Sequence, residues 1–228
     1  MGLKGNIYGF LGYYNHSRGK LDKALDWYKK AEKNDVSNPN YRMAHGVLLL
    51  RSGYFEEARA IFDKILVFYP RNESVKNNAK INLSLVYWKL GDLDAAIERM
   101  RELHNKLKNS RTYGTLGYLL IEKGDYEEAL KFNLNALEYD DTDPVVLDNI
   151  GQTYYRMGDM DNAFLYFQKA YEQKGDQAVT LYYLGDIYKQ RGELEKAREM
   201  LEKALECNIS ALSTISREKI EEKLKELG

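Results

Sequence analysis

The sequence of 228 residues contains few of the side chains that support disulfides, metal sites or rigid loops. It has one cysteine, three histidines and three prolines. The single cysteine, Cys207, excludes a disulfide within the chain and fits a reducing compartment. His16, His45 and His104 are far apart, and no pair has the i, i+4 spacing of a metal site on a helix. We therefore expect no metal site, no cofactor and no catalytic residue.

Long apolar runs and an excess of one charge are also missing. Lys and Arg number 34 against 35 Asp and Glu, and the net charge is −1. Without a basic stripe, nucleic acid is a poor candidate partner. The longest apolar run, around Val47–Leu50, is far too short to span a bilayer, and residues 1–10 lack the apolar core of a signal peptide. We expect a cytoplasmic protein, tethered to a membrane only if an upstream anchor is missing from this chain.

Small residues, by contrast, recur at a nearly fixed spacing. Six alanines are separated by 34, 38, 33, 34 and 34 residues: Ala24, Ala58, Ala96, Ala129, Ala163 and Ala197. A glycine precedes each alanine by five residues, at Gly19, Gly53, Gly91, Gly124, Gly158 and Gly192. A second small residue precedes each alanine by twelve residues, at Gly12, Gly46, Ser84, Gly117, Gly151 and Gly185. This pattern indicates one supersecondary unit copied along an axis, with a continuous core.

Residues 144–177 show how one unit is built. Asp143 before Pro144 is typical of a helix start, and apolar residues then recur at helical spacing. Gly158 predicts the turn, and a second apolar helical pattern follows it. We expect the two antiparallel helices to approach closely where Gly151 of the first meets Ala163 of the second.

This pattern resembles the tetratricopeptide repeat, a helical hairpin of 34 residues with small residues in these slots and an Ala-x3-Phe sequence. Ala24 with Tyr28, Ala58 with Phe62 and Ala163 with Phe167 match that sequence, whereas Met100, Asn133 and Leu201 fill the aromatic slot less typically. The resemblance implies an all-α, right-handed superhelix of six hairpins, closed by a C-terminal capping helix.

The expected organisation is a single domain over residues 1–228. Its repeats would be 5–38, 39–72, 77–110, 110–143, 144–177 and 178–211, followed by a capping helix at 213–227. Apolar and charged residues alternate at helical spacing in that last segment, so it can cover the apolar face of the sixth repeat. The first helix begins near Leu3 without a capping helix before it. Either the chain is cut from a longer protein, or its first face pairs with something.

In this family the first helices line a concave wall that binds other proteins. Carried over by register, the candidate partner-binding residues are Tyr13, Val47, Arg51, Asn82, Trp88, Lys89, Arg111, Tyr118, Asn149, Tyr155, Arg156, Tyr182, Tyr183 and Lys189. Aromatic and arginine side chains are common interface anchors, and Asn82 and Asn149 could bind a peptide backbone. Alternatively, Trp88, Tyr155 and Tyr183 fill space between neighbouring first helices.

The expected function is therefore a scaffold that binds a peptide or helix of a partner protein in the concave groove, without catalysis. Two alternatives stay open. The chain could be a self-assembling structural scaffold that docks through its N-terminal repeat. It could also be an accessory or sensory domain of a larger enzyme or regulator.

Overall fold

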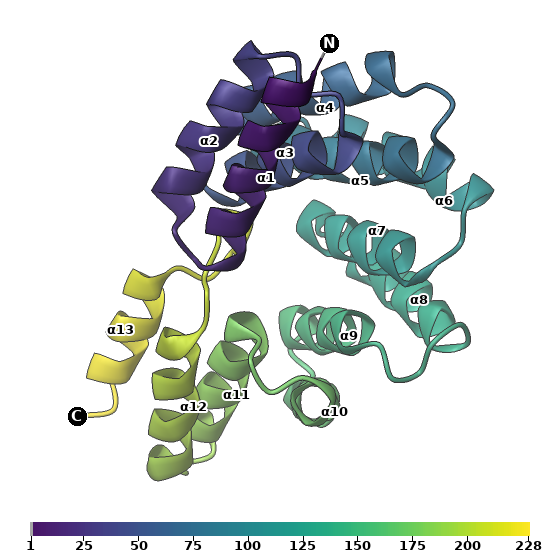
Figure 1. Cartoon of the computed structure of the whole chain (residues 1–228). Helices are drawn as coiled ribbons and strands as arrows, with labels where there is room; N and C mark the ends of the chain where they lie inside the picture. The colour runs from purple at the N-terminus through teal and green to yellow at the C-terminus, as the bar shows by residue number, and fades with distance from the viewer. Residues whose placement is uncertain (1) are drawn as a thin grey trace. The chain divides into compact units, whose positions relative to one another are not determined.

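The computed structural model describes residues 2–228, which form thirteen α-helices and no strand (Figure 1). The helices are α1 (Leu3–Ser17), α2 (Leu21–Lys33), α3 (Pro39–Arg51), α4 (Phe55–Phe68), α5 (Glu73–Lys89), α6 (Leu93–Lys106), α7 (Ser110–Lys123), α8 (Tyr126–Leu137), α9 (Pro144–Met157), α10 (Met160–Gln173), α11 (Ala178–Gln190), α12 (Leu194–Glu206) and α13 (Arg217–Lys225). The predicted all-helical class is confirmed. Within the described part of the chain, no helix is both long and apolar enough to cross a membrane.

Packing divides the chain into two compact units, Met1–Leu103 and His104–Gly228. In the first unit α1 packs against α2 and α3, and α3 packs against α4 and α5. In the second unit α7 pairs with α8, α9 with α10 and α11 with α12, while α13 packs against α12. Each unit is thus a stack of helical hairpins.

Local sequence sets the ends of the helices, as α9 illustrates. The Asp143 side chain accepts hydrogen bonds from the backbone N–H groups of Val145 (2.8 Å) and Val146 (3.3 Å), and Pro144 occupies the first helical position. At the other end Gly158 has φ +84°, a left-handed conformation that suits glycine. The predicted helix start at Asp143 and Pro144 and the predicted turn at Gly158 are therefore both present.

The close approach inside the hairpins also involves a larger side chain. A Cβ at Gly151 would lie 2.7 Å from Cδ1 of Phe167, four residues after Ala163, and a Cβ at Gly185 would meet Leu201 and the carbonyl oxygen of Ala197. The same offset recurs in Gly12 with Tyr28, Gly46 with Phe62, Gly117 with Asn133 and Gly185 with Leu201. In these five hairpins the side chain four residues after the alanine lies directly over the first helix.

The long second spacing extends a helix. α5 begins at Glu73, eleven residues before Ser84, whereas α3 begins at Pro39, seven residues before Gly46. The four additional residues form one further turn at the N-terminal end of α5. Asn72 caps that turn, because its side chain accepts a hydrogen bond from the Val75 N–H at 3.2 Å.

His45 of α3 is buried without a hydrogen bond. It is 4% exposed and stacks on Tyr28 with ring centroids 5.4 Å apart. Neither of its ring nitrogens has a hydrogen-bond partner among the described residues. Burial, with smaller effects of Lys29, Lys64 and Arg42, lowers the pKa of His45 to about 4. The imidazole is therefore neutral near pH 7.

The contact between Gly151 and Phe167 predicts a stability loss for Gly151→Ala. The added methyl must displace the Phe167 ring, at a cost of about 1–3 kcal/mol that outweighs the better helix propensity of alanine. Thermal unfolding followed by circular dichroism measures the effect. Gly175→Ala is the control, because the nearest atom to its new Cβ, Cε2 of Tyr171, lies at an ordinary 3.5 Å. Equal melting temperatures for the two variants would contradict this packing.

Buried His45 predicts a stability that falls as the solution becomes acidic. Its folded-state pKa of about 4 lies below the ordinary histidine value of 6.5, so between these pH values the unfolded state binds the proton more readily. The contribution of neutral His45 to the free energy of unfolding is therefore complete above pH 6.5. It declines as the pH falls toward 4, with a slope approaching about 1.4 kcal/mol per pH unit.

The measurement is the unfolding free energy of the wild type minus that of His45→Phe, taken by urea titration across this range. Subtraction cancels the titration of all other groups. A difference that does not change with pH would show that His45 is not buried as described.

Candidate functional site

Every predicted partner-binding residue lies on the first helix of a hairpin. In the first unit these are Tyr13 on α1, Val47 and Arg51 on α3, and Asn82, Trp88 and Lys89 on α5. In the second unit they are Arg111 and Tyr118 on α7, Asn149, Tyr155 and Arg156 on α9, and Tyr182, Tyr183 and Lys189 on α11. Although all of these residues lie on first helices, they differ in burial and in the contacts that they make.

Two of the residues in the second unit are buried between helices. Asn149 is 1% exposed, and its Nδ2 donates to the Gly114 carbonyl of α7 at 2.9 Å and to Oδ1 of Asn133 at 3.3 Å. Tyr183 is 4% exposed, and its ring stacks on Phe167 with centroids 5.2 Å apart. The amide of Asn149 therefore joins neighbouring helices in this structure.

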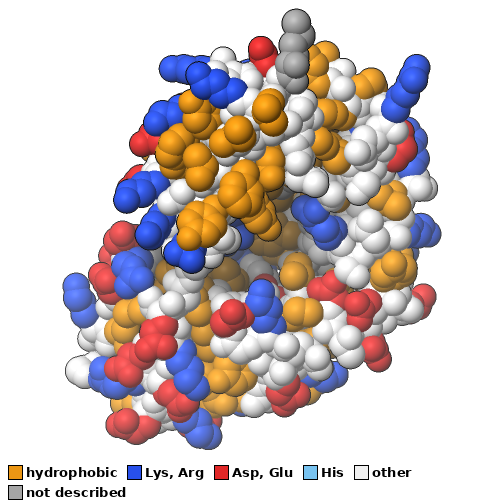
Figure 2. All heavy atoms as spheres, viewed as in Figure 1, with side chains coloured by type: hydrophobic (Ala, Val, Ile, Leu, Met, Phe, Trp, Pro, Cys, Tyr) orange, Lys and Arg blue, Asp and Glu red, His pale blue; other side chains and the backbone are white. Residues whose placement is uncertain are grey.

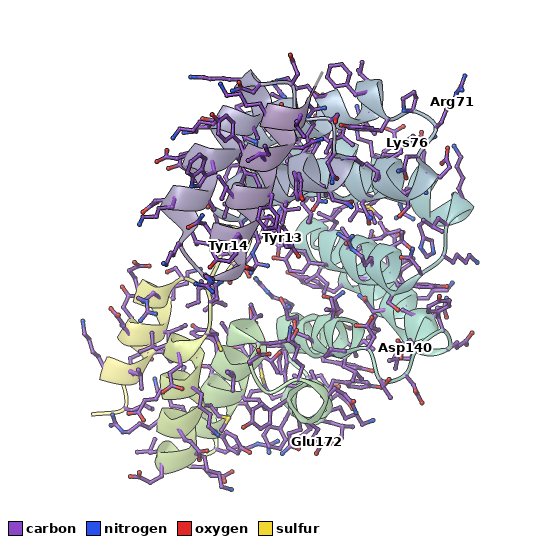
Figure 3. The ribbon with its side chains drawn as sticks, in the orientation of Figure 1. Tyr13, Tyr14, Arg71, Lys76, Asp140 and Glu172 are labelled. Carbon is purple, nitrogen blue, oxygen red and sulfur yellow. The ribbon has the colours of Figure 1, made fainter. Side chains whose placement is uncertain are left out.

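The candidates in the first unit differ in accessibility. Asn82 is buried and donates to the Asn78 carbonyl at 2.8 Å. Tyr13 is 54% exposed near the C-terminal end of α1 (Figure 3), and its ring centroid lies 6.4 Å from that of Tyr41. Arg51 is exposed, whereas Val47 is half-buried.

Lys89 and Trp88 form a contact of their own, because the Lys89 Nζ lies 4.0 Å from the centroid of the indole ring. Both side chains are half-buried on α5. In the second unit, Arg111 of α7 is exposed and Tyr118 is half-buried, and burial raises the pKa of Tyr118 above its usual range. These four side chains do not line the pocket described next.

Four predicted residues meet in one pocket of about 550 Å³ in the second unit. Tyr155 and Arg156 enter it from α9, and Tyr182 and Tyr183 enter it from α11. The C-terminal segment supplies the remaining wall through Thr214, Ile215, Lys219, Glu222, Lys223 and Glu226. The pocket thus combines phenol rings with groups of both charges.

Asp186 of α11 joins the three helices around this pocket. Its carboxylate accepts hydrogen bonds from the Tyr155 hydroxyl (2.5 Å), Gln190 Nε2 (2.8 Å) and Lys223 Nζ (2.7 Å). Burial pushes the pKa of Asp186 upward, but the hydrogen bonds from Lys223 and Tyr155 outweigh burial and leave it below the usual value. The site therefore contains an ionised carboxylate at neutral pH.

A second buried carboxylate, Asp148 of α9, is held by neutral donors. It accepts hydrogen bonds from Thr180 Oγ1 and Gln152 Nε2, each at 2.6 Å. Burial raises its pKa to about 6, and these two hydrogen bonds only partly oppose the effect. Because Thr180 belongs to α11, Asp148 ties neighbouring first helices together.

Sequence reasoning missed the C-terminal half of this pocket. The sequence predicts that residues 213–227 cover an apolar face, and Ile220 of α13 is 0% exposed. The same helix also presents Lys223 to Asp186, and Glu226 forms an ion pair with Lys189 of α11. The available signal was the spacing of Lys219, Lys223 and Glu226, which places three charged groups on one helical face.

Among residues 2–228, no group of three or more His, Cys, Asp or Glu side chains is placed to hold a metal ion. Cys207 is half-buried, its Sγ lies 3.4 Å from the Lys203 carbonyl oxygen, and burial raises its pKa. A thiol with a raised pKa is a poor nucleophile at neutral pH.

The contact with Asp186 predicts that Lys223→Met loosens α13. A lost hydrogen bond between charged groups corresponds to about tenfold faster exchange of the α13 amides with solvent. Hydrogen exchange measured by mass spectrometry on residues 216–227 tests this, with Lys225→Met, an exposed lysine of the same helix, as the control. Equal protection in the two variants would mean that Lys223 does not hold the helix.

Comparisons with known proteins identify the architecture. Sequence profiles of the tetratricopeptide repeat match residues 19–73, 78–103, 108–176 and 143–210, which together make up most of the chain. The TPR repeat-containing protein MJ1428 of Methanocaldococcus jannaschii is 26% identical over 151 residues, or 65% of this chain. The matched part spans only 26% of the length of that relative.

Solved structures show the same fold. A tetratricopeptide repeat protein from Parabacteroides merdae superposes with a TM-score of 0.82 at 21% identity, covering 99% of this chain and 84% of that one. The thermophilic TPR protein TTC0263 of Thermus thermophilus gives a TM-score of 0.66 at 21% identity, covering 83% of this chain and 98% of that one. This chain belongs to the tetratricopeptide repeat family.

Proposed function

We propose that the protein is a non-catalytic scaffold that binds a segment of another protein on its first helices. Proteins with this fold typically mediate protein–protein interaction. The observation that carries the proposal for this chain is the pocket where Tyr155, Arg156 and Tyr182 converge from α9 and α11. Tyrosine and arginine are enriched among the residues that dominate binding energy at interfaces.

The chemistry of the pocket suits side chains better than a whole peptide. Its volume of about 550 Å³ is open to solvent and accommodates a few residues of a partner. The phenol rings of Tyr155 and Tyr182 offer flat apolar contact, and Arg156 offers a fork of N–H donors. Lys189 of α11 forms an ion pair with Glu226 of the pocket wall and extends this surface beyond the pocket, and Tyr118 of α7 is a further candidate.

The buried asparagines have a different role in this proposal. Asn149 joins α9 to α7, whereas Asn82 donates to a carbonyl of its own helix and lies 3.7 Å from Sδ of Met43 on α3. Both side chains are buried, so they support the binding surface without touching the partner. Trp88 and Lys89 on α5, Arg51 and Val47 on α3, and Arg111 on α7 remain candidates for contacts along the other first helices.

The experiment compares two double variants of the intact chain as bait in an extract of the source cells. Arg156→Ala/Tyr182→Ala removes the pocket anchors, and Leu165→Ala/Leu194→Ala removes side chains that are 44% and 47% exposed on the second helices α10 and α12. We expect the first variant to lose partners that the wild type and the second variant retain, with unchanged circular dichroism spectra. Loss from the second-helix variant alone would place the binding surface elsewhere.

A further inference from the structure

The first helix has its small residues inside and its large apolar residues outside. The buried residues of α1 are Gly5, Gly9 and Gly12. Gly5 lies against the loop after α2, Gly9 against α3 and Gly12 against α2. On the outside, Leu3 is 77% exposed, Ile7 51%, Phe10 54% and Tyr14 42%. Figure 2 shows this apolar patch over α1, and Figure 3 labels Tyr14 at its end. An exposed patch of this kind marks an interaction surface.

Leu3, Ile7, Phe10 and Tyr14 form one continuous stripe, named here the α1 stripe. At 3.6 residues per turn they fall within about 60° around the helix axis and extend roughly 16 Å along it. The glycines occupy the opposite side, where a Cβ at Gly12 would lie 2.5 Å from Cδ1 of Tyr28. The close packing on the glycine side therefore leaves the α1 stripe facing away from the hairpin.

Corresponding positions in later repeats show what such a stripe packs against. Aligned on the small residue of each first helix, Ile7, Phe10 and Tyr14 correspond to Thr180, Tyr183 and Ile187 of α11. In α11 these residues are 0%, 4% and 1% exposed. Two of them contact the hairpin before them, because Thr180 donates to Asp148 of α9 and Tyr183 stacks on Phe167 of α10.

The register of α9 gives the same result. Its equivalent residues Val146, Asn149 and Thr153 are 1%, 1% and 0% exposed, and Asn149 donates to the Gly114 carbonyl of the preceding α7. The face that carries the α1 stripe is therefore one that seats a helix elsewhere in this chain.

The charges around the α1 stripe indicate which kind of helix could bind there. Residues 2–20 contain Lys4, Arg18 and Lys20 and no Asp or Glu. The Arg18 guanidinium lies 4.4 Å from the centroid of Tyr14, directly beside the stripe. Acidic groups on a partner would gain from these cations, whereas two copies of α1 packed together would bring like charges close.

We propose that the α1 stripe binds an amphipathic helix of another protein whose apolar face is flanked by Asp and Glu. A head-to-tail contact with α13 of a second copy does not fit, because the exposed side chains of α13 are charged and offer no apolar face. This surface lies in the first unit and shares no residue with the pocket of the second unit. Either binding site can therefore fail without the other.

The test uses a labelled helical peptide of 20 residues with leucines at i, i+3, i+4 and i+7 and glutamates on both flanks. A matched peptide carries lysine in place of each glutamate. Fluorescence anisotropy measures both against the wild type and against Ile7→Gln/Phe10→Gln. Because both side chains are more than half exposed, this variant should fold, and its melting curve checks that it does.

We expect the acidic peptide to bind the wild type about tenfold or more tightly than it binds the variant, and about tenfold more tightly than the lysine peptide binds the wild type. Arg156→Ala/Tyr182→Ala should bind the acidic peptide like the wild type, which separates this site from the pocket. Equal affinity for both peptides, or for wild type and Ile7→Gln/Phe10→Gln, overturns the proposal.

Two further outcomes would assign the α1 stripe to another occupant and also overturn it. One is sedimentation showing a dimer of the wild type that Ile7→Gln/Phe10→Gln abolishes. The other is flotation of the wild type, but not of this variant, with vesicles containing phosphatidylserine, since basic and apolar residues together also suit a membrane surface.

Discussion

The structure depends on one steric constraint, the glycine at which five of the six first helices pass under their partner helices, with the small residue Ser84 in the same place on α5. At Gly12, Gly46, Gly151 and Gly185 a ring or a leucine occupies the space that a Cβ would need. Because interiors are packed at crystal-like density, this notch fixes the distance between the two helices. Gly117 provides the same space, but there the neighbouring side chain is the polar Asn133. Oδ1 of Asn133 accepts a hydrogen bond from Asn149. One polar pair is thus built into an otherwise apolar contact, and it connects consecutive hairpins.

Polar contacts set the surface on which binding is proposed. Asp148 accepts a hydrogen bond from Thr180, and Asp186 accepts one from Tyr155, so α9 and α11 are held together by hydrogen bonds. Lys223 adds α13 to this arrangement. A buried carboxylate is costly unless it is hydrogen-bonded, which accounts for the number of donors around each one. The C-terminal helix therefore covers apolar residues with one face and shapes the pocket with the other.

The sequence predicted the fold well because its evidence is local and repeated. Gly158 at its turn and Asp143 before Pro144 act through backbone geometry that neighbouring residues determine. The binding residues were harder to predict, because the burial of a side chain depends on the packing between repeats. Asn149 and Tyr183 have the register of wall residues but lie under their neighbours, and no feature within one repeat distinguishes them from Tyr182. The contact of Lys223 with Asp186 joins residues 37 positions apart in different elements, which the repeat period does not encode.

We propose that partners bind the first helices, while the second helices mainly support them. Hydrogen exchange of the protein with and without a captured partner, resolved along the chain, tests this most directly. We expect new protection in α9, α11 and residues 214–226, with little change in α10 and α12. Protection confined to α10 and α12 would contradict it.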